Sequence, residues 1–107
     1  YVHVWDLAEA HVKAIEQFDN VVSQERPFLA INLGTGQGIT VLEFLELFEE
    51  VLGGKLNRVT APSRSGDSAG SFAGLERARR LLAWEPRLSL EQGIADAIKW
   101  SRKHTDQ

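Results

Sequence analysis

Cysteine and methionine are both absent from the 107 residues, and tyrosine occurs only once. Without cysteine the chain can form no disulfide and use no thiol chemistry, and this absence fits a reducing compartment. No apolar run is long enough to cross a bilayer, and no stretch is typical of a signal peptide. We therefore expect a cytoplasmic protein. The chain starts at once on strand-forming residues without a methionine, as expected of a chain cut from a longer one.

A strong charge of either sign is also missing, since the formal net charge is only −3. Such a charge gives no long-range attraction for nucleic acid or for an anionic membrane, and we expect neither as a partner. The three histidines, His3, His11 and His104, are too far apart for a metal-ligand pattern, so no metal is expected. His11 lies on the apolar face of a predicted helix, where a packed histidine is favoured over a catalytic one.

What the sequence does contain is an alternation of short apolar runs and helix-like stretches. Residues 1–5, 27–33 and 55–62 are typical of short strands, and residues 6–18, 41–52, 75–84 and 90–98 have helical spacing. The order β-α-β-α-β-α-α predicts an α/β fold with short strands and three to four helices. With 107 residues, the chain can bury one modest core in a single domain.

Capping signals mark where two of these helices begin. Asp6 with Glu9, and Thr40 with Glu43, have the spacing of a capping box. We therefore predict one helix that starts at Asp6 and a second that starts after Thr40 and is ended by Gly53 and Gly54.

Three glycines, Gly34, Gly36 and Gly38, stand between a predicted strand and a predicted helix. Their spacing is G-x-G-x-G, whereas a dinucleotide-binding turn needs G-x-G-x-x-G and a later acidic residue for the ribose. We interpret this stretch as a structural loop that turns the backbone and places Thr40 as an N-cap. A minor role beside an anionic ligand stays open, because the N-terminus of a helix attracts anions.

Arg64 and Asp67 lie three residues apart in a loop rich in serine and glycine. A guanidinium suits phosphate oxygens, and a carboxylate accepts hydrogen bonds from neighbouring sugar hydroxyls, so the pair suits a nucleotide. A local surface ion pair is an equally good interpretation, with a contribution to stability below about 1 kcal/mol.

Four segments of the chain, in order and spacing, closely resemble one family. They are YVHVWDLAEAHVKAIE, INLGTGQGITVLEF, APSRSGD and LLAWEPRLSLEQGIADAIKW. Together they resemble the C-terminal part of the UDP-glucose 4-epimerases, members of the extended short-chain dehydrogenase/reductase family. The resemblance covers nearly the whole chain. It implies that residues 1–107 form the C-terminal nucleotide-sugar-binding domain, without the N-terminal Rossmann domain.

The resemblance also implies a reaction for the parent enzyme, an isomerase that interconverts UDP-glucose and UDP-galactose. Hydride passes from C4 of the sugar to NAD, the 4-keto sugar rotates, and hydride returns to the other face. In this family the Rossmann domain holds NAD and a catalytic Tyr-x-x-x-Lys pair. Tyr1 has Trp5 four residues later instead of lysine. We therefore expect this chain alone to be inactive, with no catalytic residue and no bound NAD, and to supply binding and orientation.

Carried over by position, the resemblance implies three substrate-binding residues. Arg64 would contact the diphosphate and Asp67 the ribose hydroxyls. Tyr1 matches the tyrosine of an Arg-Asp-Tyr segment near the nucleotide, although the arginine and aspartate are missing here. Three further positions depart from the family's pattern in ways that bear on substrate affinity: Ser68, Ser71 and Gly74.

Two alternatives to this function stay open. The parent could be another enzyme of the superfamily, such as a nucleotide-sugar 4,6-dehydratase or a uronate epimerase. It could also be a non-catalytic module that binds a nucleotide sugar or a partner protein. For the epimerase fragment itself, apolar surface left uncovered by the absence of the NAD domain predicts a homo-oligomer, with exchange of a terminal strand or helix between copies.

Overall fold

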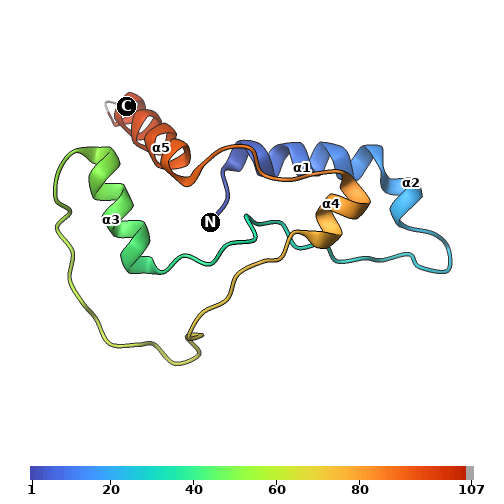
Figure 1. The fold of residues 1–107 in the computed structure, drawn as a ribbon, viewed down its shortest axis with the longest axis horizontal. Coiled ribbons are helices and arrows are strands. Elements are labelled where there is room, and N and C mark those ends of the chain that lie inside the picture. Colours follow the sequence, from blue (N-terminus) through green and yellow to red (C-terminus); the bar gives the residue numbers. More distant parts are fainter. Residues whose placement is uncertain (106–107) are drawn as a thin grey trace.

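The computed structural model describes residues 1–105, and in this part of the chain it contains five helices and no strand (Figure 1). The α/β prediction is therefore wrong. The helices are α1 (Val4–Glu16), α2 (Phe18–Val21), α3 (Val41–Leu52), α4 (Glu76–Leu82) and α5 (Leu90–His104).

Two of the predicted strands, residues 27–33 and 55–62, lie outside any helix but do not pair as strands. Apolar, β-branched residues favour extended backbone, whereas a strand also needs a neighbour that accepts and donates its backbone hydrogen bonds. One carbonyl in the first segment, that of Ala30, instead accepts a hydrogen bond of 2.8 Å from the Arg77 guanidinium. The apolar side chains of Phe28 and Val59 remain 79% and 89% exposed. The sequence pattern therefore correctly excluded a helix in these two segments, but it does not provide the neighbouring strand that a sheet requires.

The remaining predicted strand, residues 1–5, is not a strand either, because α1 already begins at Val4. The N-cap of this helix is His3, whose Nδ1 accepts a hydrogen bond of 3.0 Å from the backbone N–H of Trp5. Capping by this side chain satisfies one of the free N–H groups at the helix start, so α1 begins at Val4. The predicted N-cap at Asp6 is wrong, because Asp6 lies within the first turn and is buried.

The helices form two groups at opposite ends of the molecule (Figure 1). At one end α3 packs against α5, and at the other α1 contacts α2 and α4. The main hydrophobic cluster belongs to the second group and to the loop that follows α4; its buried members are Ala10, Leu75, Ala78, Leu82 and Trp84. The core therefore lies between α1 and α4.

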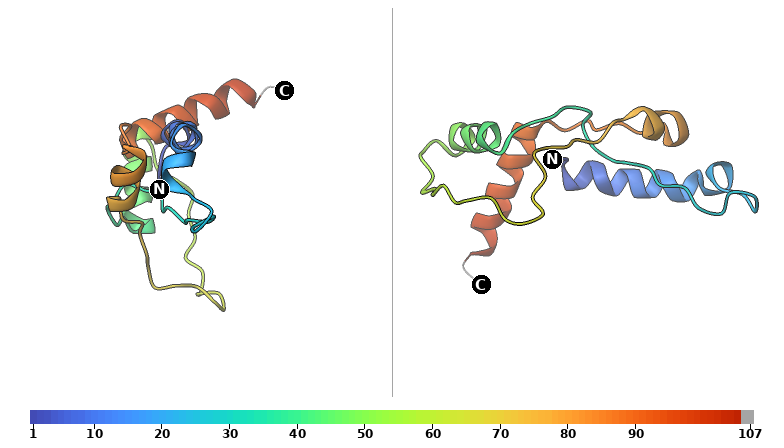
Figure 2. Two further views of the ribbon diagram at one scale, coloured as in Figure 1. Left: turned by 90° about the vertical axis from the view of Figure 1, so that its right-hand side faces the viewer. Right: turned by 90° about the horizontal axis from the view of Figure 1, so that it is seen from below.

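The molecule is extended for its size. Its radius of gyration is 17.4 Å, with extents of 52 × 35 × 25 Å, whereas a compact chain of this length has a radius of about 13 Å. The segment between α3 and α4 swings far out from the helices before it returns, as the yellow trace shows in Figures 1 and 2. Every residue from 57 to 72 is exposed.

The ends of α3 follow the predicted chemistry. Thr40 Oγ1 accepts from the N–H of Glu43, and the Glu43 carboxylate accepts from the N–H of Thr40, which confirms the capping box. At the other end Gly53 takes a left-handed conformation, with φ of 78°, that favours glycine. None of the helices within residues 1–105 is long and apolar enough to span a membrane.

Candidate functional site

The long exposed loop carries Arg64 and Asp67 in one tight turn. The N–H of Asp67 donates to the carbonyl of Arg64 at 3.1 Å, and the Asp67 carboxylate accepts from the N–H of Arg64 at 2.8 Å. Gly66, the third residue of the turn, has a φ of 89°, which glycine adopts without strain. The structure therefore brings these two predicted residues together through the backbone of their own turn.

The side chains of the pair are only loosely joined. Nη2 of Arg64 lies 3.6 Å from Oδ1 of Asp67, and the Arg64 side chain is 89% exposed. An ion pair this open to solvent is weak. The Asp67 carboxylate is held mainly by the backbone, which leaves the guanidinium free to move toward an anion. This geometry suits the binding of phosphate by Arg64 and of hydroxyl groups by Asp67.

Tyr1 lies in a different place, at the junction of α3 and α5. Its ring stacks on Phe44 with the ring centres 4.4 Å apart. Both rings line an open, largely apolar pocket of about 630 Å³ that also includes Phe48 and Trp100. Neither Arg64 nor Asp67 is among the described residues that line this pocket. The structure thus separates Tyr1 from the other two predicted site residues.

Glu49 anchors the start of the exposed loop, a role that the sequence reasoning missed. Its carboxylate accepts from the N–H of Leu56 at 3.1 Å and from Lys55 Nζ at 3.2 Å, and lies 3.8 Å from Arg58 Nε. The hydrogen bond from Leu56 is the main reason that the pKa of the Glu49 carboxyl is lowered. The nearby cations lower this pKa further, and desolvation opposes them. One buried carboxylate therefore ties the loop to α3.

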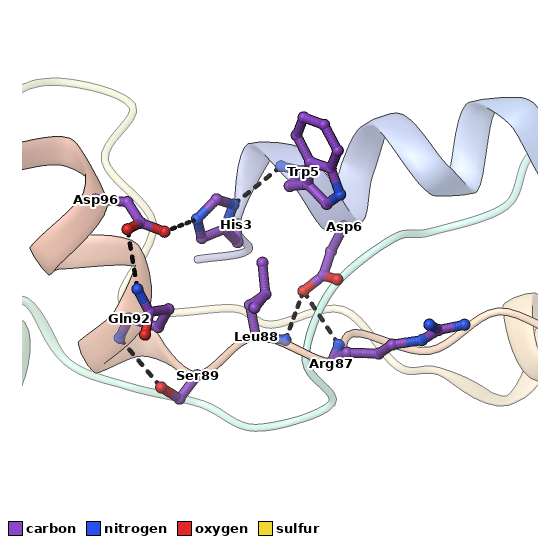
Figure 3. A network of polar contacts seen from close by, with 8 residues as sticks. All are labelled: His3, Trp5, Asp6, Arg87, Leu88, Ser89, Gln92 and Asp96. Carbon is purple, nitrogen blue, oxygen red and sulfur yellow. Dashed lines mark hydrogen bonds and ion pairs between the residues drawn. The ribbon is translucent and has the colours of Figure 1, made fainter. Parts of the chain in front are cut away.

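A second missed interaction joins the N-terminal segment to α5 (Figure 3). His3 Nε2 lies 2.9 Å from Asp96 Oδ2, and Gln92 Nε2 donates to the other oxygen of Asp96 at 2.9 Å. Because His3 Nδ1 accepts the capping hydrogen bond from Trp5, the proton that reaches Asp96 is on Nε2. These bonds, first from His3 and then from Gln92, lower the pKa of the Asp96 carboxyl.

Asp6 makes a second long-range connection, also drawn in Figure 3. Its buried carboxylate accepts from the N–H groups of Arg87 and Leu88, at 3.1 and 3.0 Å. The backbone carbonyl of Asp6 accepts a hydrogen bond of 2.8 Å from the indole of Trp84. Asp6 therefore holds the segment between α4 and α5 against α1, rather than capping a helix.

His11 differs from its predicted environment. It is exposed instead of packed, and its Nδ1 lies 2.7 Å from the carbonyl of Leu7 in the same helix. Across residues 1–105, no group of three or more histidine, aspartate or glutamate side chains is placed to hold a metal ion.

Comparisons with known proteins give a consistent picture. No family model matches the chain. A UDP-glucose 4-epimerase of Bacillus subtilis is 42% identical over 106 residues, which are 99% of this chain and 30% of that protein. One from Drosophila melanogaster is 36% identical over 104 residues, 97% of this chain and 29% of that protein. The chain thus spans about 30% of the length of the curated relatives it matches.

A solved structure shows the same similarity in three dimensions. The crystal structure of UDP-glucose 4-epimerase from Bifidobacterium longum, in complex with NAD⁺ and UDP, superimposes with a TM-score of 0.86 at 31% identity. The match covers 99% of this chain and 30% of that one. The resemblance to UDP-glucose 4-epimerases is therefore confirmed, and the coverage is consistent with a C-terminal fragment of such an enzyme.

Proposed function

We propose that this chain, a relative of the UDP-glucose 4-epimerases, is the C-terminal part of such an enzyme and forms its nucleotide-sugar-binding domain over residues 1–107. The parent enzyme would be an isomerase that interconverts UDP-glucose and UDP-galactose through a 4-keto intermediate. The observation that carries the proposal is the Arg64–Asp67 turn, which presents a cation and an anion side by side on an exposed loop. The UDP in the similar crystal structure supports it.

In this proposal the two side chains divide the nucleotide between them. The 89% exposed guanidinium of Arg64 can leave its weak contact at 3.6 Å for a diphosphate oxygen at little cost. The backbone N–H of Arg64 keeps hold of Oδ2 of Asp67, so that Oδ1 is left to accept from ribose hydroxyls. Tyr1 is a proposed third contact near the nucleotide. In the structure it lies apart from the Arg64–Asp67 turn and stacks on Phe44.

NAD belongs to the proposed parent enzyme, where it accepts hydride from C4 of the sugar and returns it. The glycines of this chain do not fit such a cofactor. Side chains of residues 72–75 already lie against the open faces of Gly34, Gly36 and Gly38, where a pyrophosphate would need to approach the backbone. The sole tyrosine has no lysine four residues later. We therefore assign binding and orientation to this chain, and no step in epimerisation by the chain alone.

Calorimetric titration of the chain with UDP, UDP-glucose and NAD tests this function. We expect saturable binding of UDP and UDP-glucose, no binding of NAD, and loss of UDP binding in Arg64→Ala and Asp67→Ala. The exposed residues Arg102 and Asp19 offer matched controls, since Arg102→Ala and Asp19→Ala remove the same charges elsewhere. Absence of saturable UDP binding by the unsubstituted chain would contradict the proposal, as would equal loss in the control variants.

We also propose that the isolated chain self-associates. Several apolar side chains of α1 are exposed, among them Val4, Val12 and Ile15 at 73%, 54% and 77%, and Phe18 at the start of α2 is 58% exposed. Val4 and Ile15 are about three helical turns apart and therefore form a stripe on one face of α1, and burying this stripe against a second copy would remove apolar area from water. Exchange of a terminal helix between copies is one way to form such a dimer.

A further inference from the structure

The glycine loop touches the returning end of the exposed loop. A Cβ at Gly34 would lie only 2.8 Å from the Cβ of Ala73, a separation that real Cβ contacts essentially never show. A Cβ at Gly38 would lie 3.2 Å from the ring of Phe72. Two segments about 40 residues apart in sequence therefore meet at a point where only glycine fits without movement.

Of these three glycines, Gly34 has the neighbour that can adapt least. At Gly36 the nearest atoms belong to the end of the Leu75 side chain, and it is the backbone, with φ of 75°, that disfavours a side chain there. The Cβ of Ala73 has no rotamer and moves only with its own backbone. A side chain at residue 34 would therefore displace the backbone around Ala73.

Ala73 stands at the point where the exposed loop regains contact with the rest of the molecule. Residues 57–72 are exposed, Ala73 is partly buried, and Leu75 is 7% exposed in the core cluster. At its other end the loop is held by Glu49, which binds the N–H of Leu56. The Arg64–Asp67 turn thus lies in a loop that contacts the rest of the molecule at two points, Leu56 and Ala73.

We infer that Gly34 is a positioning residue for the Arg64–Asp67 turn: its close contact with Ala73 fixes the end of the loop and so determines where the turn is presented. The consequence for UDP rests on the proposed function. A side chain at residue 34 is expected to displace the turn and to weaken UDP binding about tenfold, although residue 34 touches neither Arg64 nor Asp67.

The absence of cysteine allows a direct test by paired spin labels. Ser65→Cys places one label in the turn and Ser101→Cys a second on α5, and both positions are exposed. Electron paramagnetic resonance then gives the distribution of distances between the two labels. In this background we expect Gly34→Ala to shift or broaden the distribution and Ala73→Gly, which removes the contact without a clash, to broaden it.

The double variant Gly34→Ala with Ala73→Gly exchanges the two side chains and is expected to restore the narrow distribution. Gly54→Ala is the matched control, because a Cβ there meets nothing within 4 Å. A Gly34→Ala variant as helical as the parent, with an unchanged distribution, would overturn the inference. If Gly34→Ala loses its helical circular dichroism, the Ala73→Gly variant decides, and an unchanged distribution there overturns the inference as well.

Titration of the same variants with UDP separates this inference from the proposed function. We expect weaker binding in Gly34→Ala, recovery in the double variant and parental affinity in Gly54→Ala. Failure of the parent to bind UDP would contradict the proposed function, whereas the label distances would still decide whether Gly34 positions the turn.

Discussion

His3 and Asp96, 93 positions apart in the sequence, are joined by a contact of 2.9 Å between Nε2 and Oδ2. The same imidazole caps α1 through Nδ1, so one side chain fixes the start of α1 and ties it to α5. The side chain of His3 is only 11% exposed, whereas that of Asp96 is 45% exposed. The N-terminal segment that carries Tyr1 is therefore held in place from two directions.

Substitution of His3 separates these two roles. Asparagine is a good N-cap but too short to reach Asp96, whereas alanine provides neither function. We expect His3→Ala to lower the free energy of unfolding by about 1 kcal/mol more than His3→Asn does, which is the typical contribution of an N-cap. Urea denaturation followed by circular dichroism measures the difference. Equal destabilisation by the two substitutions would show that the cap contributes nothing.

Glu49 predicts a dependence of stability on pH. The hydrogen bond from Leu56 lowers the pKa of its carboxyl below the ordinary value of 4.5. Because the folded state favours the charged form, its contribution is complete above about pH 4.5 and is lost as the pH falls through the lowered pKa. We expect Glu49→Gln to flatten the fall in unfolding free energy between about pH 5 and pH 3, because the glutamine amide does not titrate.

The exposed neighbour Glu50 provides the control for this experiment. Glu50→Gln removes the same charge from the same helix without touching the anchor at Leu56. Its profile of unfolding free energy against pH is expected to follow that of the parent chain. A Glu49→Gln profile as steep as the parent's would mean that the carboxylate does not stabilise the folded state.

Local signals explain which parts of this fold the sequence predicts correctly. Thr40 with Glu43 and the glycine at 53 act within one helical turn of their own position, and the structure confirms both helix ends. The Arg64–Asp67 pair is equally local, because four consecutive residues form the turn. Interactions between close neighbours can be read from spacing alone.

Long-range signals explain what the sequence reasoning missed. His3 contacts Asp96, and the carboxylate of Asp6 accepts hydrogen bonds from the N–H groups of Arg87 and Leu88. Most of the chain lies between the partners of each pair. No periodic pattern marks such pairs, and the capping signature at Asp6 favoured a local role instead. The predicted strands failed for a related reason, because residues 27–33 and 55–62 have strand-like side chains but no strand beside them within residues 1–105.

Trp84 predicts a strong effect from the loss of one hydrogen bond. Its ring is 1% exposed, and its indole N–H donates to the carbonyl of Asp6 at 2.8 Å. Trp84→Phe removes this donor, leaves a gap beside the core and is expected to cost about 2 kcal/mol of unfolding free energy. Trp100 is 65% exposed, so Trp100→Phe is the control and is expected to change stability by less than about 0.5 kcal/mol. Urea denaturation of both variants tests the contrast, and comparable losses would refute it.

The exposed apolar stripe on α1 predicts that the chain self-associates. A charged residue in this stripe is expected to weaken the association. Ile15 is 77% exposed and lies three residues from each of the exposed residues Val12 and Phe18, so a lysine there would place a charge inside the proposed interface without disturbing the core. We expect the mass measured by light scattering to rise with concentration for the parent chain, and Ile15→Lys to shift this rise to a higher concentration. Glu16→Lys changes the charge one residue away and controls for net charge, because Glu16 is exposed and outside the stripe. A monomeric mass for the parent chain at high concentration would contradict the proposal, since an apolar surface that remains uncovered there has no affinity for a second copy.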